Sequence, residues 1–272
     1  MSMSFPFGQP VQRVRQRERT PKRVFILGVY ASAVHAIWLN EEGRVLVRAL
    51  AVASEPYIFW RGDRADEIIS GINMPDRAGR LLAAPASLNG PTGQSLDRDF
   101  IAPLSAGKRA LTREDVWLCD LVPHSCMNPG QRKALEREYY PLAKELGLPT
   151  ATLPEVPSIL ADDSRRKEIQ EELEESCAEV LVLLGDQPIR WFLNAFHPNW
   201  KCLADFGTTP NEYGRLHPMN IGRRSMQVLP VCHPRQAAGL GFHSTRWREL
   251  HSHWKSGDSR YLSTSPRLNR PG

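Results

Sequence analysis

The stretch that decides the fold is residues 24–36, VFILGVYASAVHA. Residues 24–27 form a continuous apolar run, which is typical of a strand covered on both faces in a parallel sheet. Gly28 ends this strand, and a glycine at that point lets the backbone approach a ligand closely. Ser32 then stands where it would cap a helix starting at Ala33, whose free amides would bind an anion or phosphate. An ordinary strand-to-helix corner explains the same residues.

The composition bounds the class of protein. With 272 residues and 41% hydrophobic content, the chain can bury one substantial core. The formal net charge of +5 suits a polyanionic partner without identifying one. No apolar run is long enough to span a bilayer, and the N-terminus lacks the order of a secretory signal. We therefore expect a cytoplasmic protein without a membrane partner.

The cysteines argue against a metal centre or a disulfide framework. The chain has five of them, which are odd in number, scattered, and never spaced as CxxC. Four metal ligands at recognisable intervals are absent as well. We expect reduced, buried thiols, no metal and no cofactor.

Further apolar runs and turn signals extend the pattern along the chain. Strands are expected at 44–53, 116–122, 180–185 and 226–232, and helices at 131–146, 164–177, 189–196 and 245–255. Parallel strands that alternate with helices predict a three-layer α/β/α sandwich with a central, mostly parallel four-stranded sheet. This domain spans 24–256, between a flexible basic arm at 1–23 and a polar basic tail at 257–272.

Polar or glycine residues follow the expected strands. They are Gly28 with Val29 and Tyr30, Asp120, Gly185 with Asp186, and His233. In such a fold ligands bind beyond the carboxyl ends of the strands, so we expect these residues to share one rim. The aromatic cluster Tyr57, Phe59 and Trp60 is either core or a wall on which a base stacks.

Four segments together resemble the uracil-DNA glycosylase superfamily. They are LGVYASA after the first strand, VWLCDLVP, VLVLLG and VCHPRQAAGLG after the last strand, in the family's order. The resemblance spans nearly the whole chain, and its most specific element is the His-Pro pair that follows the last strand. It implies a monomer that flips a base out of double- or single-stranded DNA and hydrolyses the N-glycosidic bond without a metal, leaving an abasic site.

The resemblance also implies roles for individual residues. His233 would match the histidine that donates to the carbonyl oxygen of the leaving base, and Arg235, Gln236 and Ala237 would match the loop that enters the minor groove. Asp120 would match the base-reading asparagine. Each residue also has a purely structural interpretation. His233 would be a capping or core histidine, and Asp120 would be a strand-end carboxylate in a helix cap or an ion pair.

Two departures from the family pattern affect the function. The family's first motif often carries an acid that positions the attacking water, whereas residues 29–32 here are Val-Tyr-Ala-Ser. The attacking water would then have to be positioned by backbone and hydroxyl groups, by Tyr30 at the pocket wall, or by an acid such as Asp120 or Asp186. Otherwise the protein binds DNA without cleaving the glycosidic bond. In addition, ionised Asp120 only accepts hydrogen bonds, so it complements an exocyclic amine and repels the carbonyl of uracil.

We therefore expect a preference for a cytosine-type base. Because excision of plain cytosine would endanger the host genome, we expect the base to be a modified form, such as glucosylated hydroxymethylcytosine in phage DNA. This places the chain near phage-defence members of the superfamily. Gly28, Val29 and Ser32 would contact the substrate, and Tyr57, Phe59 or Trp60 would stack on the base. The candidates for DNA contacts are Arg223, Arg224, Arg235, Gln236, Arg246 and Lys255, although each cation alone is more often simply solvated.

Three alternatives remain open. One is a uracil or mismatch repair glycosylase. Another is a catalytically silent DNA-binding module on the same scaffold, which the missing acid favours. A nucleotide-binding enzyme of Rossmann type is disfavoured, because the first turn lacks GxGxxG.

Overall fold

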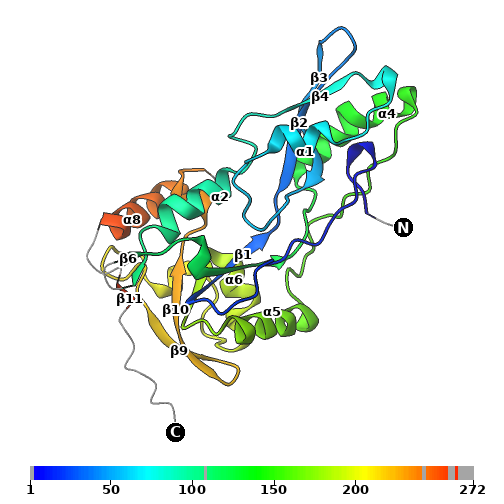
Figure 1. Ribbon diagram of the computed structural model, residues 1–272. Coiled ribbons are helices and arrows are strands. Elements are labelled where there is room, and N and C mark those ends of the chain that lie inside the picture. The colour runs from blue at the N-terminus through cyan, green and yellow to red at the C-terminus, as the bar shows by residue number, and fades with distance from the viewer. Residues whose placement is uncertain (1–2, 107–108, 241–242, 257–260, 263–272) are drawn as a thin grey trace. The chain divides into compact units, whose positions relative to one another are not determined.

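The computed structural model describes residues 3–106, 109–240, 243–256 and 261–262 (Figure 1). The chain divides into two compact units, each made of separate stretches. Unit 1 comprises Met1–Arg19, Leu27–Gln94 and Leu118–Glu172, and unit 2 comprises Thr20–Ile26, Ser95–Trp117 and Leu173–Gly272. The expected tail, 257–272, lies outside the described residues apart from the short strand β11 (Tyr261–Leu262).

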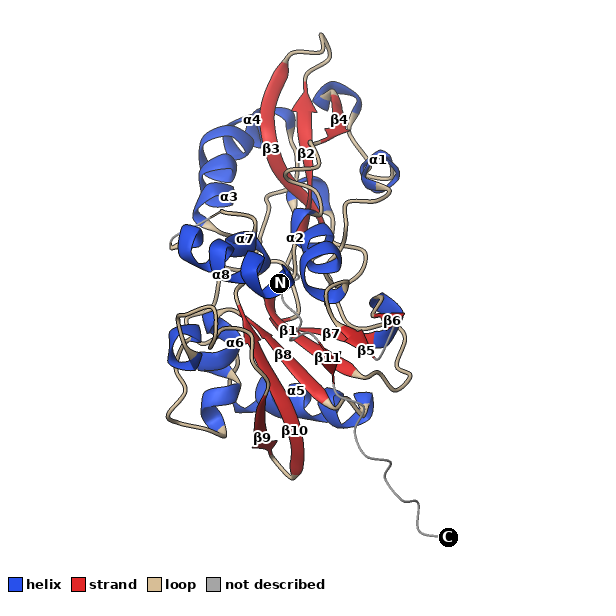
Figure 2. Ribbon diagram, turned by 90° about the vertical axis from the view of Figure 1, so that its left-hand side faces the viewer, coloured by secondary structure: helices blue, strands red, loops and turns tan. Residues whose placement is uncertain are grey.

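The main sheet has five strands in the order β7-β1-β8-β10-β9 (Figure 2). Their bounds are Val116–Val122 for β7, Val24–Tyr30 for β1, Val180–Leu184 for β8, Arg224–Val231 for β10 and His217–Ile221 for β9. β10 runs parallel to β8 and antiparallel to β9. The mixed α/β class and the mostly parallel sheet are confirmed, but the sheet has a fifth strand, β9, which lacks a continuous apolar run.

The predicted strands of the main sheet match because their residues are apolar on both faces. All seven residues of β7 and all five of β8 are buried, as expected for strands covered from both sides. In unit 2, the register pairs Gln227 with Val180 and Val231 with Leu184. The expected bounds of β7, β8 and β10 are therefore right to within two residues, whereas β1 ends three residues later than expected.

The expected helix after the first strand is wrong. β1 continues through Gly28 to Tyr30, and the next element is the strand β2 (Ala33–Leu39). Ser32 therefore caps no helix there, and the anion site at a helix N-terminus does not exist. A short apolar stretch containing Val34, Ile37 and Trp38 is ambiguous between helix and strand, and its β-branched and aromatic residues favour the strand.

A second, antiparallel sheet in unit 1 accounts for this strand. Its order is β3-β2-β4, with β3 at Val45–Ser54 and β4 at Arg80–Ala83. β2 is the central strand, since Ala36 pairs with Leu50 on one side and Ala83 on the other. The strand expected at 44–53 is thus present, but it lies in this sheet and not in the parallel one. A small third sheet, β11-β5-β6, contains β5 (Ser105–Ala106) and β6 (Arg109–Ala110).

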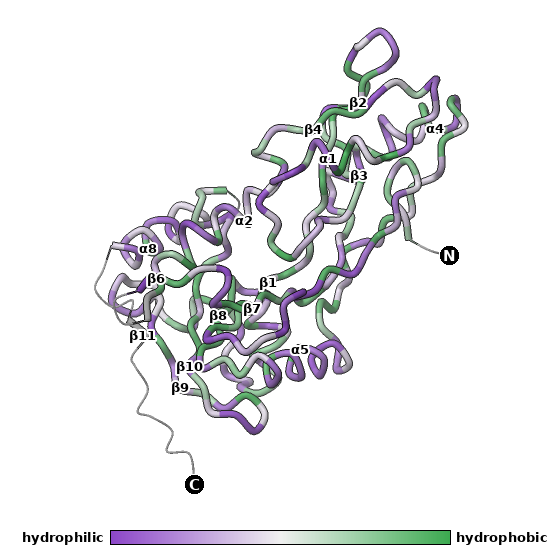
Figure 3. The backbone as a smooth tube through the Cα atoms, in the orientation of Figure 1, coloured by the Kyte–Doolittle hydropathy of each residue, from purple (hydrophilic) through white to green (hydrophobic). Residues whose placement is uncertain are grey.

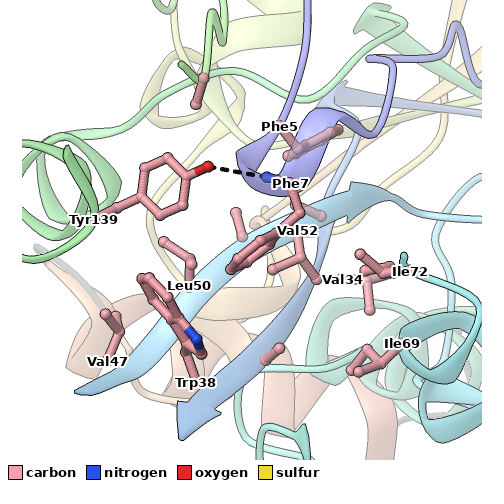
Figure 4. Close-up of a cluster of buried hydrophobic side chains, with 14 of the residues drawn as sticks. Phe5, Phe7, Val34, Trp38, Val47, Leu50, Val52, Ile69, Ile72 and Tyr139 are labelled. Carbon is pink, nitrogen blue, oxygen red and sulfur yellow. Dashed lines mark hydrogen bonds between the residues drawn. The ribbon is translucent and has the colours of Figure 1, made fainter. Parts of the chain in front are cut away.

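The core of unit 1 includes the start of the chain. Phe7 packs edge-on against Trp38 and Tyr139, with ring centroids 5.2 and 5.5 Å apart, and Phe5 is fully buried. The amide of Phe7 donates to the hydroxyl of Tyr139 at 3.1 Å (Figure 4). The arm expected to be flexible is therefore anchored by two aromatic side chains near its start.

Helices lie near the four later positions predicted for them, although α6 begins and ends earlier than the expected 189–196. The expected run at 131–146 consists of α3 (Pro129–Ala134), a π-helical turn (Leu135–Tyr139) and α4 (Tyr140–Leu146). α5 (Asp163–Ser176) is strongly hydrophilic (Figure 3), and α6 (Asp186–Trp191) follows β8. α7 (Pro234–Ala237) and α8 (Ser244–Ser256) end the described chain before β11.

Short elements fill the loop-rich remainder. They are α1 (Ala65–Ser70), α2 (Pro91–Ser95), the π turn Leu96–Ile101 and the 3-10 turns Pro6–Gly8, Asp76–Ala78, Arg113–Asp115, Leu193–Ala195 and Leu203–Phe206. Across the described ranges, no helix combines the length and apolar content needed to cross a membrane.

Candidate functional site

Unit 1 brings together three residues that are far apart in the sequence, namely Gly28, Phe59 and Asp120. A Cβ added to Gly28 would lie less than 3.0 Å from both Asp120 Oδ1 and Phe59 Cζ. Real Cβ atoms essentially never make such close contacts, so only glycine leaves room for this arrangement. The close approach at Gly28 is made here by side chains of the same unit, and the approach of a ligand to this glycine stays a prediction.

Phe59 is held in a strained backbone conformation. Its φ of 51° lies in the left-handed region, which costs on the order of 1 kcal/mol or more for a residue with a side chain. Gly93 packs beneath it, because a Cβ there would come within 3.0 Å of the carbonyl oxygens of Phe59 and Trp60. The surrounding structure thus fixes the position of the Phe59 ring beside Asp120.

The other two members of the aromatic cluster have structural partners. Trp60 is 1% exposed, and its Nε1 donates to the carbonyl of Asp63 at 2.8 Å. Tyr57 donates its hydroxyl proton to the carboxylate of Asp63. Of the two interpretations of this cluster, the core interpretation therefore fits Trp60, and Phe59 is the ring that lies at the candidate site.

Asp120 is buried without a hydrogen-bond partner for its carboxyl group among the described residues. It is 3% exposed, and this burial raises its pKa to about 7, opposed by the charge of Arg165. Arg165 nevertheless does not bond to the carboxyl group. Its guanidinium donates to the backbone carbonyls of Asp120 at 2.7 Å and Leu121 at 3.0 Å. The carboxyl group therefore remains available to a ligand.

Glu55 is a site residue that the sequence did not indicate. It follows β3 and is 2% exposed. Its Oε2 accepts from the amide of Trp60 at 3.2 Å, and the amides of Ser32 and Phe59 also donate to its carboxyl group. Its Oε1 is buried and has no partner. Burial and the nearby Asp120 raise its pKa to about 8. The only sequence signal is a single acid within an apolar and aromatic stretch.

The turn between β1 and β2 is fixed by neighbouring loops. The amide of Ala31 donates to the carbonyl of Val122 at 3.2 Å, and Ser125 donates its hydroxyl proton to the carbonyl of Ser32. Val29 is partly buried and Tyr30 is 38% exposed. The turn thus contributes a backbone amide to Glu55, through Ser32, and no acid of its own.

His233 lies in unit 2, at the N-cap of α7. Its Nδ1 accepts from the amide of Arg235 at 3.2 Å, and its own amide donates to Gln236 Oε1 at 3.0 Å. Burial and the charge of Arg235 lower its pKa to about 4. The imidazole is therefore neutral at pH 7 and carries its proton on Nε2, where it is a hydrogen-bond donor. The capping role and a functional role are compatible, because they use different nitrogens.

The ends of β8 and β10 lie side by side, as expected. A Cβ on Gly185, whose φ is +83°, would lie 3.2 Å from His233 Cβ, and its amide donates to Val231 at 2.7 Å. Asp186 accepts from the amide of Leu203 at 2.8 Å and so caps another segment. Asp120 belongs to unit 1 and His233 to unit 2.

A buried chain of hydrogen bonds supports the His233 segment. The amide of Cys232 donates to the hydroxyl of Tyr213 at 2.9 Å, and that hydroxyl lies 2.8 Å from His251 Nδ1. His251 Nε2 lies 3.0 Å from the carbonyl oxygen of Asp99. This arrangement makes Nε2 the protonated nitrogen of His251 and the Tyr213 hydroxyl a donor to Nδ1.

Most of the predicted DNA-contacting residues have partners within unit 2. Arg224 donates to the carbonyls of Leu173 and Ala178, Lys255 pairs with Asp99 at 2.6 Å, and Arg246 donates to Thr208 at 2.9 Å. Gln236 caps His233.

The remaining two candidates, Arg223 and Arg235, lie at opposite ends of β10. Arg223 is exposed but precedes β10, whereas His233 follows it. Eight strand residues separate them by roughly 26 Å. Arg223 and Arg224 therefore lie at the opposite end of β10 from His233, whereas Arg235, exposed on α7, is the cation next to this histidine. DNA contact by these arginines stays a prediction.

A separate cavity of ≈ 420 Å³ in unit 1 does not contain the Asp120 cluster. Its lining includes Met3, Arg13, His124, Ile159 and Arg165. No group of His, Cys, Asp or Glu among the described residues is arranged to hold a metal ion. A scan against protein-family models and a search of curated proteins find no match to this chain.

Proposed function

We propose that the protein is a DNA glycosylase with a uracil-DNA glycosylase-like fold that removes a cytosine-type base. The observation that carries this proposal is the buried carboxyl group of Asp120, which has no partner and lies beside the Phe59 ring at Gly28. A buried polar group without a partner is costly and is typical of a site that awaits a ligand. An aromatic ring next to a polar edge reader suits a flat, hydrogen-bonding ligand such as a nucleobase.

The proposed reaction is hydrolysis of the N-glycosidic bond of a flipped nucleotide. The bond between C1′ of the sugar and the base nitrogen breaks, and the base leaves with the electron pair. A water oxygen bonds to C1′, and the proton that this water loses ends on the nitrogen of the departing base. The resemblance assigns His233 the role of donating from Nε2, the nitrogen left protonated by the bond between Nδ1 and the Arg235 amide, to a carbonyl oxygen of the base, where negative charge develops. The products are the free base and an abasic site.

Specificity for a cytosine-type base follows from the carboxyl chemistry of Asp120. A carboxylate accepts hydrogen bonds from the exocyclic amine of cytosine, whereas the carbonyl of uracil at the same position would be repelled. Unmodified cytosine is abundant in any genome, so the proposal extends to a modified form such as glucosylated hydroxymethylcytosine in phage DNA, with a role in antiviral defence.

Base-excision assays test the proposal. Labelled duplex and single-stranded DNA containing uracil, cytosine, hydroxymethylcytosine or its glucosylated form is incubated with the protein and treated with alkali. Strand breaks at the cytosine-type base are expected. His233→Ala should reduce excision by at least about a hundredfold, while His253→Ala, at an exposed position of α8, should not. Uracil as the preferred base would contradict the specificity.

A catalytically silent DNA-binding module is the second candidate. The turn at residues 29–32 favours it, because that turn carries no acid to position water. DNA binding without an abasic product from any of these substrates would establish this alternative and refute the glycosylase.

A further inference from the structure

We propose that Glu55 and Asp120 act as one carboxyl pair that presents one hydrogen-bond donor and one acceptor to the edge of an aminopyrimidine base. The inference rests on the proposed function for its ligand. Its structural basis is a separate observation, namely that unit 1 holds two acids that are each more than nine-tenths buried at one loop. Asp120 lies beside the Phe59 ring at Gly28, and Glu55 accepts hydrogen bonds from the amides of Phe59 and Trp60 in the same loop.

The contacts of Glu55 leave one of its carboxyl oxygens, Oε1, without a hydrogen-bond partner, so this oxygen can carry a proton. Three backbone amides, those of Ser32, Phe59 and Trp60, donate to its carboxyl group, yet Oε1 is buried without any partner. An ionised carboxylate with one bare oxygen in such a place is costly. A proton on that oxygen removes the charge and turns it into a hydrogen-bond donor.

The surrounding charges favour a single shared proton. The titratable group that faces Glu55 is Asp120, and the charged group that faces Asp120 is Arg165. Arg165 directs its donors to the carbonyls of Asp120 and Leu121 and to Glu168, so it does not neutralise the carboxyl group by direct contact. Two buried carboxyl groups near one another do not both ionise at neutral pH.

A pair with one proton complements an aminopyrimidine. Asp120 accepts from the exocyclic amine, and the protonated carboxyl group of Glu55 donates to the ring nitrogen beside it. Aspartate alone lacks this donor. Uracil carries the opposite pattern, a ring N–H next to a carbonyl, and would need the proton on the other carboxyl group. Sites that read an edge by buried hydrogen bonds discriminate strongly, so we expect at least a tenfold preference.

Two variants separate the donor from its titration. Glu55→Gln keeps a donor, the amide NH₂, that never titrates, whereas Glu55→Met has a similar size and no donor. For wild type, excision of the cytosine-type base should fall about tenfold per pH unit above pH 8, since the pKa of Glu55 is about 8. Glu55→Gln should remain active without this decline. Glu55→Met should lose the tenfold preference over uracil.

Infrared spectroscopy gives a readout that does not need DNA. Wild type should show the C=O stretch of a buried protonated carboxyl group that disappears as the pH rises through about 8, and Glu55→Gln should lack it. Glu172→Gln, at a second buried glutamate, should retain the band. Excision without this band, or an unchanged pH decline in Glu55→Gln, would overturn the inference alone. The band without excision of any base would instead refute the proposed function.

Discussion

The substitution Gly28→Ala tests whether the close approach of Asp120 and Phe59 is essential to the site. The added methyl group would lie less than 3.0 Å from Asp120 Oδ1 and Phe59 Cζ, whereas ordinary contact begins at about 3.4 Å. Neither neighbour can yield easily, because Asp120 is 3% and Phe59 6% exposed. Overpacking of this kind costs about 1–3 kcal/mol. Displacing the ring and the carboxyl group should lower base excision by more than the loss of folded protein explains.

The measurements are urea unfolding and base excision on the same preparations. Gly71→Ala is a matched control in the same unit, because the nearest atom to its added methyl group would be 3.5 Å away. We expect the control to keep the wild-type midpoint and activity. If Gly28→Ala matched the control in both measurements, Asp120 and Phe59 would not form a tight site, and the reasoning from this contact would be refuted.

Three further predictions concern single side chains. Asp120→Asn should shift the base preference toward uracil, because an amide both donates and accepts; an unchanged base profile in the excision panel would exclude base reading by this residue. Tyr213→Phe should destabilise the protein by about 1–3 kcal/mol in urea unfolding, because the buried amide of Cys232 and Nδ1 of His251 lose their partner. Burial would raise the pKa of Asp99, but hydrogen bonds from Arg98, Lys255 and Ser95 outweigh it and hold the pKa well below its usual value. The stability that these bonds provide is therefore present above pH ~4 and lost as the pH falls below it, and Asp99→Asn should show a weaker acid dependence of its unfolding midpoint.

The elements predicted well from the sequence are those whose signal is local. β7 and β8 are continuous apolar runs, and such runs indicate a strand buried on both faces. β2 was missed because its seven residues satisfy helix and strand patterns alike, and its identity depends on pairing with β3 and β4. β9 was missed for a related reason. β9 has no continuous apolar run, and it is a strand because it pairs with β10.

The site could be predicted only in part. Asp120 and His233 are visible in the sequence because Asp120 is the one acid within the apolar run of β7 and His233 follows the apolar run of β10. Glu55 gives no such signal, since a single acid after a strand is ordinary. Its importance comes from burial and from amides that the turn at Ser32 and the Phe59–Trp60 loop bring to it. Those contacts depend on the second sheet, which the sequence did not indicate.

The backbone around Asp120 in unit 1 and around His233 in unit 2 is held by side chains in a similar way. Within β7, Arg165 binds the carbonyls of Asp120 and Leu121 and does not bond to the Asp120 carboxyl group. After β10, Gln236 and Tyr213 hold the amides of His233 and Cys232, and Nδ1 of His233 is also engaged. Nε2 is left as the donor. In both places neighbouring side chains bind the backbone. This fixes the position of one polar group, the Asp120 carboxyl or the His233 Nε2, without forming a hydrogen bond to it. Anchoring of this kind lowers the entropy lost on binding, and it distinguishes Asp120 and His233 from Asp186, whose carboxylate accepts from the amide of Leu203.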